Sequence, residues 1–134
     1  SITPLPQTGN PRPRLFRLTE DKALINRMGF NNDGLEVVAR RLERHAGDGQ
    51  FVAANLASTT ASADPLQDFV ILTRRLAPLV ELVVVDISCP NTANGKMFLR
   101  RDPLNDLLAA RVKQLAGSLP VICDSALTCF VHRP

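Results

Sequence analysis

The chain has 134 residues, of which 45% are hydrophobic and only 4% aromatic, with no tryptophan or tyrosine. This composition excludes low-hydrophobicity disorder and predicts one domain, or part of one, with an aliphatic core. The net charge of +3 is small and few aromatic residues accompany the arginines near the N-terminus, so we expect no nucleic-acid partner.

The cysteines and the hydropathy pattern exclude two further classes of protein, those with a cysteine zinc site and those that span a membrane. Cys89, Cys123 and Cys129 are an odd number and lack the spacing of a zinc site, so we expect no metal and a reducing compartment. No apolar run approaches the roughly 20 residues that span a bilayer.

The N-terminal part is expected to be a loop followed by a short helix. Residues 1–14 contain four prolines and a Gly-Asn pair, which predicts an extended, turn-rich loop. Thr19 is a suitable N-cap, and two acidic residues follow it, so a helix is predicted to about Met28. Turn-forming residues then occupy positions 30–34.

The remainder alternates helices with strands. Apolar residues at three- and four-residue spacing predict helices at about residues 35–46, 65–77 and 104–117. Short apolar runs predict strands at residues 51–55, 81–87 and 119–123. Asp64-Pro65 and Asp102-Pro103 are expected helix starts. This order indicates an α/β fold with a parallel sheet and right-handed crossovers, either a small open sheet or an excerpt from a barrel.

The second predicted strand carries the most informative residues. Its β-branched run is typical of a strand buried on both faces, and its carboxyl end is rich in polar groups: Asp86, Ser88, Cys89 and Asn91. Asn55 ends the preceding strand. Because carboxyl ends of parallel strands meet at one edge, we expect a site there. The alternative is that the asparagines are turn and capping residues.

The thiol of Cys89 has two interpretations. A free cysteine is usually a buried, inert residue, whereas a thiol in a loop at a strand end can act as a nucleophile or proton acceptor if its pKa is lowered. His45 on a polar helix face and His132 in the tail are not candidates for acid–base work. No classical nucleotide-binding glycine loop is present.

Several motifs occur together in order: SITP at residues 1–4, GNPRPR at 9–14, LFRL at 15–18, INRMGFNN at 25–32 and SCPNT at 88–92. With Asn55 between the last two, they resemble the dihydroorotate dehydrogenases, especially the quinone-dependent, membrane-associated class (class 2). The resemblance extends over roughly residues 1–119.

The resemblance implies a fold and a function. The fold would be part of an FMN-binding (β/α)₈ TIM barrel, about three βα units of it, so the chain would be a fragment. Residues 1–121 would be the partial barrel, and residues 122–134 match nothing in the family. The family oxidises dihydroorotate to orotate with a quinone acceptor, in de novo pyrimidine (UMP) biosynthesis. It is a peripheral membrane family, which implies the cytoplasmic face of a bacterial inner membrane, or the mitochondrial inner membrane.

The resemblance also implies roles for individual residues. Those expected to bind dihydroorotate or orotate are Asn26, Arg27, Met28, Gly29, Phe30, Ser88, Pro90 and Asn91. Those expected to contact FMN are Ser1, Asn55 and Asp86. Cys89 would be the catalytic base, removing a proton from substrate carbon while hydride passes to the flavin. Arg17 would lie near the quinone entrance.

The chain departs from the family pattern at four places. Cys89 replaces the serine usual in the quinone class, and Asp86 stands where the family has asparagine. The family's Gly/Lys-rich continuation after Asn55 reads LASTT, and Asp124 precedes Ser125 where a flavin-contacting lysine is expected.

Two alternatives follow from these departures. Cys89 is typical of the soluble classes, so the parent could be another FMN pyrimidine oxidoreductase. Asp86 and the missing lysines instead favour a non-catalytic remnant or interaction module. As a separate polypeptide the chain is expected to be inactive, because an incomplete barrel leaves strand edges and an aliphatic sheet face unpaired.

Overall fold

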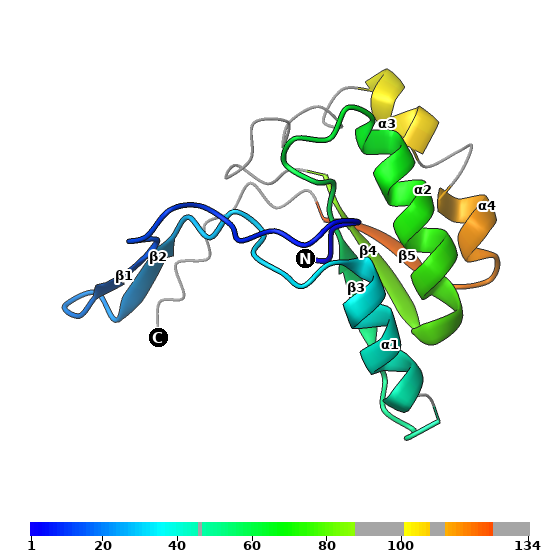
Figure 1. Ribbon diagram of the computed structural model, residues 1–134, viewed down its shortest axis with the longest axis horizontal. Helices are drawn as coiled ribbons and strands as arrows, with labels where there is room; N and C mark the ends of the chain where they lie inside the picture. The colour runs from blue at the N-terminus through cyan, green and yellow to red at the C-terminus, as the bar shows by residue number, and fades with distance from the viewer. Residues whose placement is uncertain (46, 88–100, 108–111, 125–134) are drawn as a thin grey trace.

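The computed structural model of the chain describes residues 1–45, 47–87, 101–107 and 112–124. Within these ranges, a parallel sheet has helices packed on one face, and a separate β-hairpin projects from this body (Figure 1). The N-terminus lies beside the sheet (Figure 1). This arrangement confirms the predicted α/β class with a parallel sheet.

The sheet consists of parallel strands in the order β3-β4-β5, and their bounds are β3 Ala53–Leu56, β4 Leu82–Asp86 and β5 Val121–Asp124. The register pairs Asn55 with Val84 and Asp86 with Asp124. β3 begins two residues later than expected and leaves Phe51 73% exposed. All three predicted strands are therefore present, with ends shifted by one or two residues.

The helices are α1 Leu35–His45, α2 Pro65–Leu76, the 3₁₀ turn η1 Ala77–Leu79, α3 Arg101–Leu107 and α4 Lys113–Ala116. The first two confirm the predicted helices. The third predicted helix corresponds to α3 and α4, and residues 108–111 between them lie outside the described residues. The start of α2 is as expected, since Asp64 Oδ1 accepts a hydrogen bond from the Gln67 N–H at 3.0 Å, and proline follows the cap.

The core lies between the sheet and α2. Alternate strand residues, Ala54 and Leu56 on β3 with Val83 and Val85 on β4, are buried, and the α2 residues Phe69, Leu72 and Leu76 are buried with them. Each of the valine, leucine and phenylalanine side chains contributes about 1.5–3 kcal/mol through removal from water. The opposite face of the sheet is less covered, since Val84 is half-buried and Ile122 is 52% exposed. The expected burial of β4 on both faces therefore holds for only one face among the described residues.

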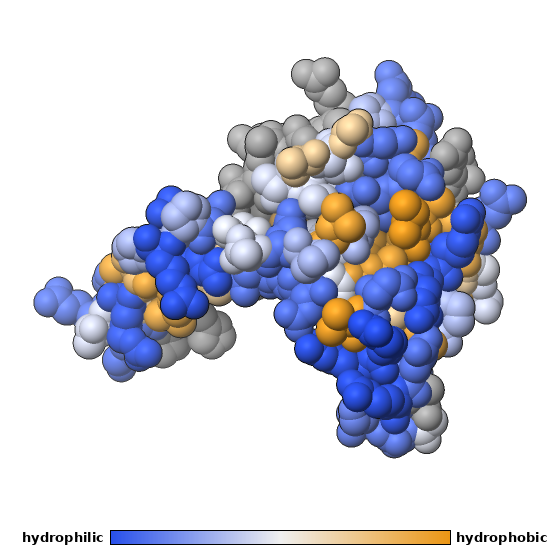
Figure 2. All heavy atoms as spheres, in the orientation of Figure 1, coloured by the Kyte–Doolittle hydropathy of each residue, from blue (hydrophilic) through white to orange (hydrophobic). Residues whose placement is uncertain are grey.

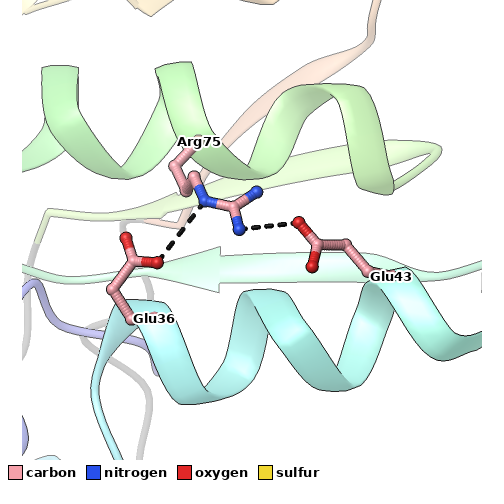
Figure 3. A network of polar contacts seen from close by, with 3 residues as sticks. All are labelled: Glu36, Glu43 and Arg75. Carbon is pink, nitrogen blue, oxygen red and sulfur yellow. Dashed lines mark hydrogen bonds and ion pairs between the residues drawn. The ribbon is translucent and has the colours of Figure 1, made fainter.

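An ion-pair network joins α1 to α2 at the surface (Figure 3). Arg75 Nη2 lies 2.6 Å from Glu43 Oε1, and Arg75 Nε lies 3.7 Å from Glu36 Oε2. The hydrogen bond with Glu43, and then the attraction of both carboxylates, raise the pKa of Arg75 despite partial desolvation. The two glutamates lie seven positions apart, so they present two carboxylates to one arginine.

The predicted helix from Thr19 to Met28 is wrong. These residues belong instead to an antiparallel hairpin of β1 Leu15–Leu18 and β2 Ala23–Asn26. Lys22, in the left-handed region at φ +49°, donates its N–H to the Thr19 carbonyl at 3.3 Å and closes the turn. Threonine and acidic residues favour helix starts and turns alike. The cross-strand pairing of Phe16 with Ile25 favours the turn.

No helix within the described ranges has the length and apolar character to cross a membrane. Among the same residues, no cluster of three or more histidine, cysteine or acidic side chains is placed to hold a metal ion.

Candidate functional site

The first candidate cluster lies at the carboxyl end of the parallel sheet. The N-terminal segment runs alongside β3 there: the Ile2 N–H donates to the Asn55 carbonyl oxygen at 2.7 Å, and the Ala57 N–H donates to the Ile2 carbonyl oxygen at 2.9 Å. Ile2 forms a parallel bridge with Leu56. This pairing places Ser1 at the edge where β3 and β4 end.

Three polar side chains meet at this edge. Asn55 Nδ2 donates to Ser1 Oγ at 3.2 Å, and Ser1 Oγ donates to Asp86 Oδ2 at 3.3 Å. The structure thus brings together the three residues expected to contact FMN, although they lie up to 85 positions apart in the sequence. The parallel register explains how Asn55 and Asp86 share the edge, as the sequence predicted.

The chemistry of this edge fits a flavin ring. Asn55 Oδ1 is a buried acceptor without a hydrogen-bond partner among the described residues, and an unpaired buried acceptor is costly unless a donor reaches it. An isoalloxazine ring presents both an N–H donor and carbonyl acceptors along one side. The amide of Asn55 and the hydroxyl of Ser1 supply complementary groups.

The second candidate cluster is the segment that follows the hairpin, Asn26–Phe30. Its backbone is held by the proline-rich loop: the Asn10 N–H donates to the Met28 carbonyl oxygen at 3.0 Å, and Asn10 Nδ2 donates to the Arg27 carbonyl oxygen at 2.7 Å. The Arg27 N–H donates to the Arg14 carbonyl oxygen at 2.9 Å. The segment is therefore fixed by backbone contacts with the proline-rich loop.

Gly29 is required by this contact. It has φ +71°, which favours glycine, and a Cβ there would lie 2.7 Å from Asn10 Cγ and 2.9 Å from Asn10 N. Phe30 follows with φ +53°, an uncommon conformation for a residue with a bulky side chain. Two consecutive left-handed residues turn the chain sharply at the end of this segment.

The side chains of Asn26 and Arg27 are partly used within the protein. Asn26 Oδ1 accepts from the Met28 N–H at 3.3 Å. Arg27 Nε and Nη2 donate to the carbonyl oxygens of Pro13 and Pro11 at 3.2 and 3.3 Å. The arginine therefore braces the proline-rich loop, a role that its sequence context did not indicate.

Arg17 lies on the hairpin, exposed to solvent. It is paired directly with Leu24 on β2, and side chains of paired residues share one face of a hairpin. Leu15, two residues earlier on β1, lies on the same face, and Leu15 and Leu24 are 57% and 58% exposed. Figure 2 shows apolar side chains among hydrophilic ones on this hairpin, at the left of the view.

The remaining predicted residues are Ser88, Cys89, Pro90 and Asn91, and all four lie outside the described residues. Asp124 is in register with Asp86 at the end of the neighbouring strand.

The structure also shows contacts made by polar residues that had no expected role from the sequence. Gln7, Asn10 and Asn32 make hydrogen bonds between segments distant in sequence. The signal in the sequence that could have pointed to these contacts was the presence of amide side chains at three loop positions.

Comparisons with known proteins give a consistent result. The family model described as dihydroorotate dehydrogenase matches residues 1–126. A dihydroorotate dehydrogenase (quinone) of Bradyrhizobium sp. (strain ORS 278) is 47% identical over 132 residues, covering 94% of this chain and 36% of the relative. Its counterpart in Rhodopseudomonas palustris (strain BisA53) is 45% identical with the same coverage.

Two solved structures from Eimeria tenella are similar in fold. A dihydroorotate dehydrogenase in complex with ferulenol superposes with a TM-score of 0.80 at 33% identity, over 86% of this chain and 32% of that one. The ligand-free form gives 0.78 at 32% identity, over 86% of this chain and 34% of that one. The chain thus spans about a third of the length of the relatives that it matches.

Proposed function

The chain belongs to the dihydroorotate dehydrogenase family, and from that premise we propose that it carries part of the site of an FMN-dependent enzyme that oxidises dihydroorotate to orotate with a quinone acceptor. The observation that carries this proposal is the meeting of Ser1, Asn55 and Asp86 at the carboxyl edge of the sheet. In barrels of this kind, that edge holds the active site.

Ser1, Asn55 and Asp86 would hold FMN, which when bound supplies the hydride acceptor. The buried and unpartnered Asn55 Oδ1 supports this assignment, because a ring N–H would satisfy it. The barrel strands would position the flavin, and the protein groups around it would orient it and tune its electronics.

Asn26–Phe30, with Ser88, Pro90 and Asn91, would bind the pyrimidine and its carboxylate. Amide side chains suit this ring because they both donate and accept hydrogen bonds. The hydrogen bonds from Asn10 to the carbonyl oxygens of Arg27 and Met28 support a preorganised segment, since binding is stronger when the site needs no ordering.

Cys89 would remove the proton from substrate carbon. A thiol is more acidic than a hydroxyl, so it yields the basic form more easily at neutral pH. Such a group accelerates proton transfer by about 10²–10⁴-fold.

Arg17 would face the quinone, and the protein that contains this chain would be a peripheral membrane protein. Two observations support this assignment. Leu15 and Leu24 expose apolar surface on the same hairpin face as Arg17, and an open groove of about 570 Å³ runs beside it, lined by Arg12, Pro13, Arg14, Leu15 and Met28. Its lining includes Leu15 of the hairpin and Met28 of the segment Asn26–Phe30, which we call the substrate segment. The cytoplasmic face of a bacterial inner membrane is the location we propose.

A second candidate function is a non-catalytic remnant. The observation that favours it is the place of Asp86, whose carboxylate lies at the edge with Ser1 and Asn55. Negative charge at this edge opposes the accumulation of electrons on a nearby cofactor.

A hybrid enzyme distinguishes the two functions. In the Bradyrhizobium relative, the matching segment is replaced by residues 1–121 of this chain, and the purified hybrid is assayed for bound FMN and for dihydroorotate-dependent reduction of a quinone. The unmodified relative is the control. We expect FMN to be retained and quinone to be reduced, with fumarate inert as an acceptor.

Each other outcome has a defined meaning. A hybrid that folds, as judged by circular dichroism, but lacks FMN or dihydroorotate oxidation identifies a remnant. Reduction of fumarate in place of quinone identifies a soluble-class oxidoreductase, as Cys89 alone would suggest.

A further inference from the structure

The side chain of Asn32 joins three segments of the chain. Its Oδ1 accepts hydrogen bonds from the N–H groups of Thr3 at 3.3 Å and Gly34 at 2.8 Å. Its Nδ2 donates to the Phe30 carbonyl oxygen at 2.7 Å and to Thr3 Oγ1 at 2.9 Å. An asparagine amide offers two donors and two lone pairs, so the whole capacity of this side chain is used.

One end of this link leads to the carboxyl end of β3 and β4 where Ser1, Asn55 and Asp86 meet, which we call the flavin edge. Thr3 is fully buried, and its Oγ1 donates to the Leu5 carbonyl oxygen at 2.6 Å. It directly follows Ile2, whose backbone is hydrogen-bonded to Asn55. Asn32 therefore holds the segment that places Ser1 in its cluster.

The other end leads to the substrate segment. The Phe30 carbonyl oxygen also accepts from Gln7 Nε2 at 3.3 Å, and Gln7 Oε1 accepts from the Thr60 N–H at 2.8 Å, in the loop after β3. Gln7 and Asn32 exchange two backbone hydrogen bonds of 3.0 Å. Phe30 thus has two side-chain amides on its carbonyl group.

These contacts explain how Phe30 keeps an unfavourable conformation. A left-handed backbone is unfavourable for a non-glycine residue and persists only when its surroundings fix it. The two donors on the Phe30 carbonyl supply that restraint.

We propose that Asn32 is a positioning residue that fixes the substrate segment Asn26–Phe30 relative to the flavin edge. It acts through Phe30 and Thr3 and has no free hydrogen-bonding group for a ligand. The proposal rests on the proposed function only in that this segment binds the pyrimidine.

Amide hydrogen exchange on the full chain tests the positioning directly. Asn32→Asp retains an acceptor for Thr3 and Gly34 but loses both Nδ2 donors. Asn31→Asp is the matched control, because Asn31 is the exposed neighbour and undergoes the same change of charge. We expect exchange at the Gln7 and Asn10 amides to be about tenfold faster in Asn32→Asp only, as for the loss of the one hydrogen bond that Nδ2 makes to the substrate segment, at the Phe30 carbonyl oxygen.

The exchange pattern separates positioning from general stabilisation. Amides of Leu72 and Leu76 in α2 should exchange at the wild-type rate, because none of the hydrogen bonds of the Asn32 side chain among the described residues reaches that helix. Asn32→Ala should in addition expose the amides of Thr3 and Gly34. The proposal is overturned if Asn32→Asp exchanges like Asn31→Asp, or if the α2 amides accelerate by the same factor as Gln7 and Asn10.

A kinetic arm in the hybrid enzyme connects this positioning to the substrate. Asn32→Asp should raise the KM for dihydroorotate about tenfold while kcat changes less than twofold, whereas Asn31→Asp should alter neither constant. An unchanged KM would also overturn the proposal. A hybrid that oxidises no dihydroorotate at all refutes the proposed function, and the exchange experiment still decides the positioning role.

Discussion

At the scale of single residues, Asp86 places a carboxylate at the edge where Ser1 and Asn55 lie. Its carboxylate accepts from Ser1 Oγ, which in turn accepts from Asn55 Nδ2. The cluster is therefore a directed chain of donors that ends on an acidic residue. An asparagine there would accept the same hydrogen bond from Ser1 without a charge.

Asp86→Asn in the hybrid enzyme should increase FMN affinity, by about tenfold, and raise the midpoint potential of the bound flavin. Removing a negative charge stabilises the electron-rich reduced cofactor. Flavin release on dilution and a dye-equilibrated redox titration measure the two effects. Asp21→Asn, an exposed change on the hairpin turn, is the control. Identical values in wild type and Asp86→Asn would show that the carboxylate does not face the flavin.

Cys123 gives a prediction on pH dependence. It is a half-buried free thiol on β5, and desolvation raises its pKa. The folded state then retains the thiol proton at pH values where the unfolded chain has lost it. This contribution to stability is complete below the unfolded pKa and is lost as pH rises towards the folded pKa.

Alkylation followed by mass spectrometry checks this prediction, because it resolves Cys123 from the other two cysteines. The pH profile of Cys123 alkylation should be displaced to higher pH in the native chain than in the urea-denatured chain. Coincident profiles would contradict the raised pKa.

At the scale of elements, apolar periodicity and helix caps predicted a helix correctly where no other structure suited the same residues. The Asp64-Pro65 start and the apolar spacing in α2 predicted that helix correctly. The same type of signal failed at Thr19, because its hydroxyl and the acids after it suit a turn equally well. What decides between the two is the pairing of β1 with β2, which depends on residues on both sides of the turn.

Asp64→Ala should destabilise the chain by about 1 kcal/mol, the usual contribution of an N-cap side chain. The loss is that of the hydrogen bond from the Gln67 N–H. Asp64→Asn keeps an acceptor at the same place and should change stability by no more than a few tenths of a kcal/mol. Urea unfolding followed by circular dichroism compares the two. Equal losses in both variants would mean that the carboxylate acts by its charge.

The candidate site could be predicted from the sequence only in part. That Asn55 and Asp86 share one edge follows from the parallel strands, in which Asn55 pairs with Val84, two residues before Asp86. The place of Ser1 does not, because it depends on the pairing of Ile2 beside β3, and proline-rich sequence gives no indication of such a bridge. The role of Asn32 was equally hidden, since the one distant partner that its side chain has among the described residues, Thr3, lies 29 positions away in the proline-rich N-terminal loop.

At the scale of the whole molecule, the described part has one well-covered sheet face and one that is only partly covered. Val84 is half-buried and Ile122 is more than half exposed on the second face, where the polar groups of Asn55 and Asp86 also lie. A partly covered sheet face agrees with the family fold and with a chain that spans about a third of the relatives' length.

The separate 134-residue chain should therefore not bind FMN stoichiometrically, because Ser1, Asn55 and Asp86, the groups proposed to hold FMN, all lie at one edge of a partial barrel. Titration of the purified chain with FMN, followed by flavin absorbance and fluorescence, checks this. Saturable one-to-one binding would show that the chain holds a complete flavin site by itself.

The most direct test of a dihydroorotate-oxidising site is the reduction of bound flavin by dihydroorotate in the hybrid enzyme under anaerobic conditions. Addition of dihydroorotate should bleach the oxidised flavin absorbance and form one orotate per flavin. Cys89→Ala should slow this bleaching at least about 100-fold while FMN stays bound. An FMN-loaded hybrid that dihydroorotate fails to bleach would contradict the claim that this chain carries part of a dihydroorotate-oxidising site.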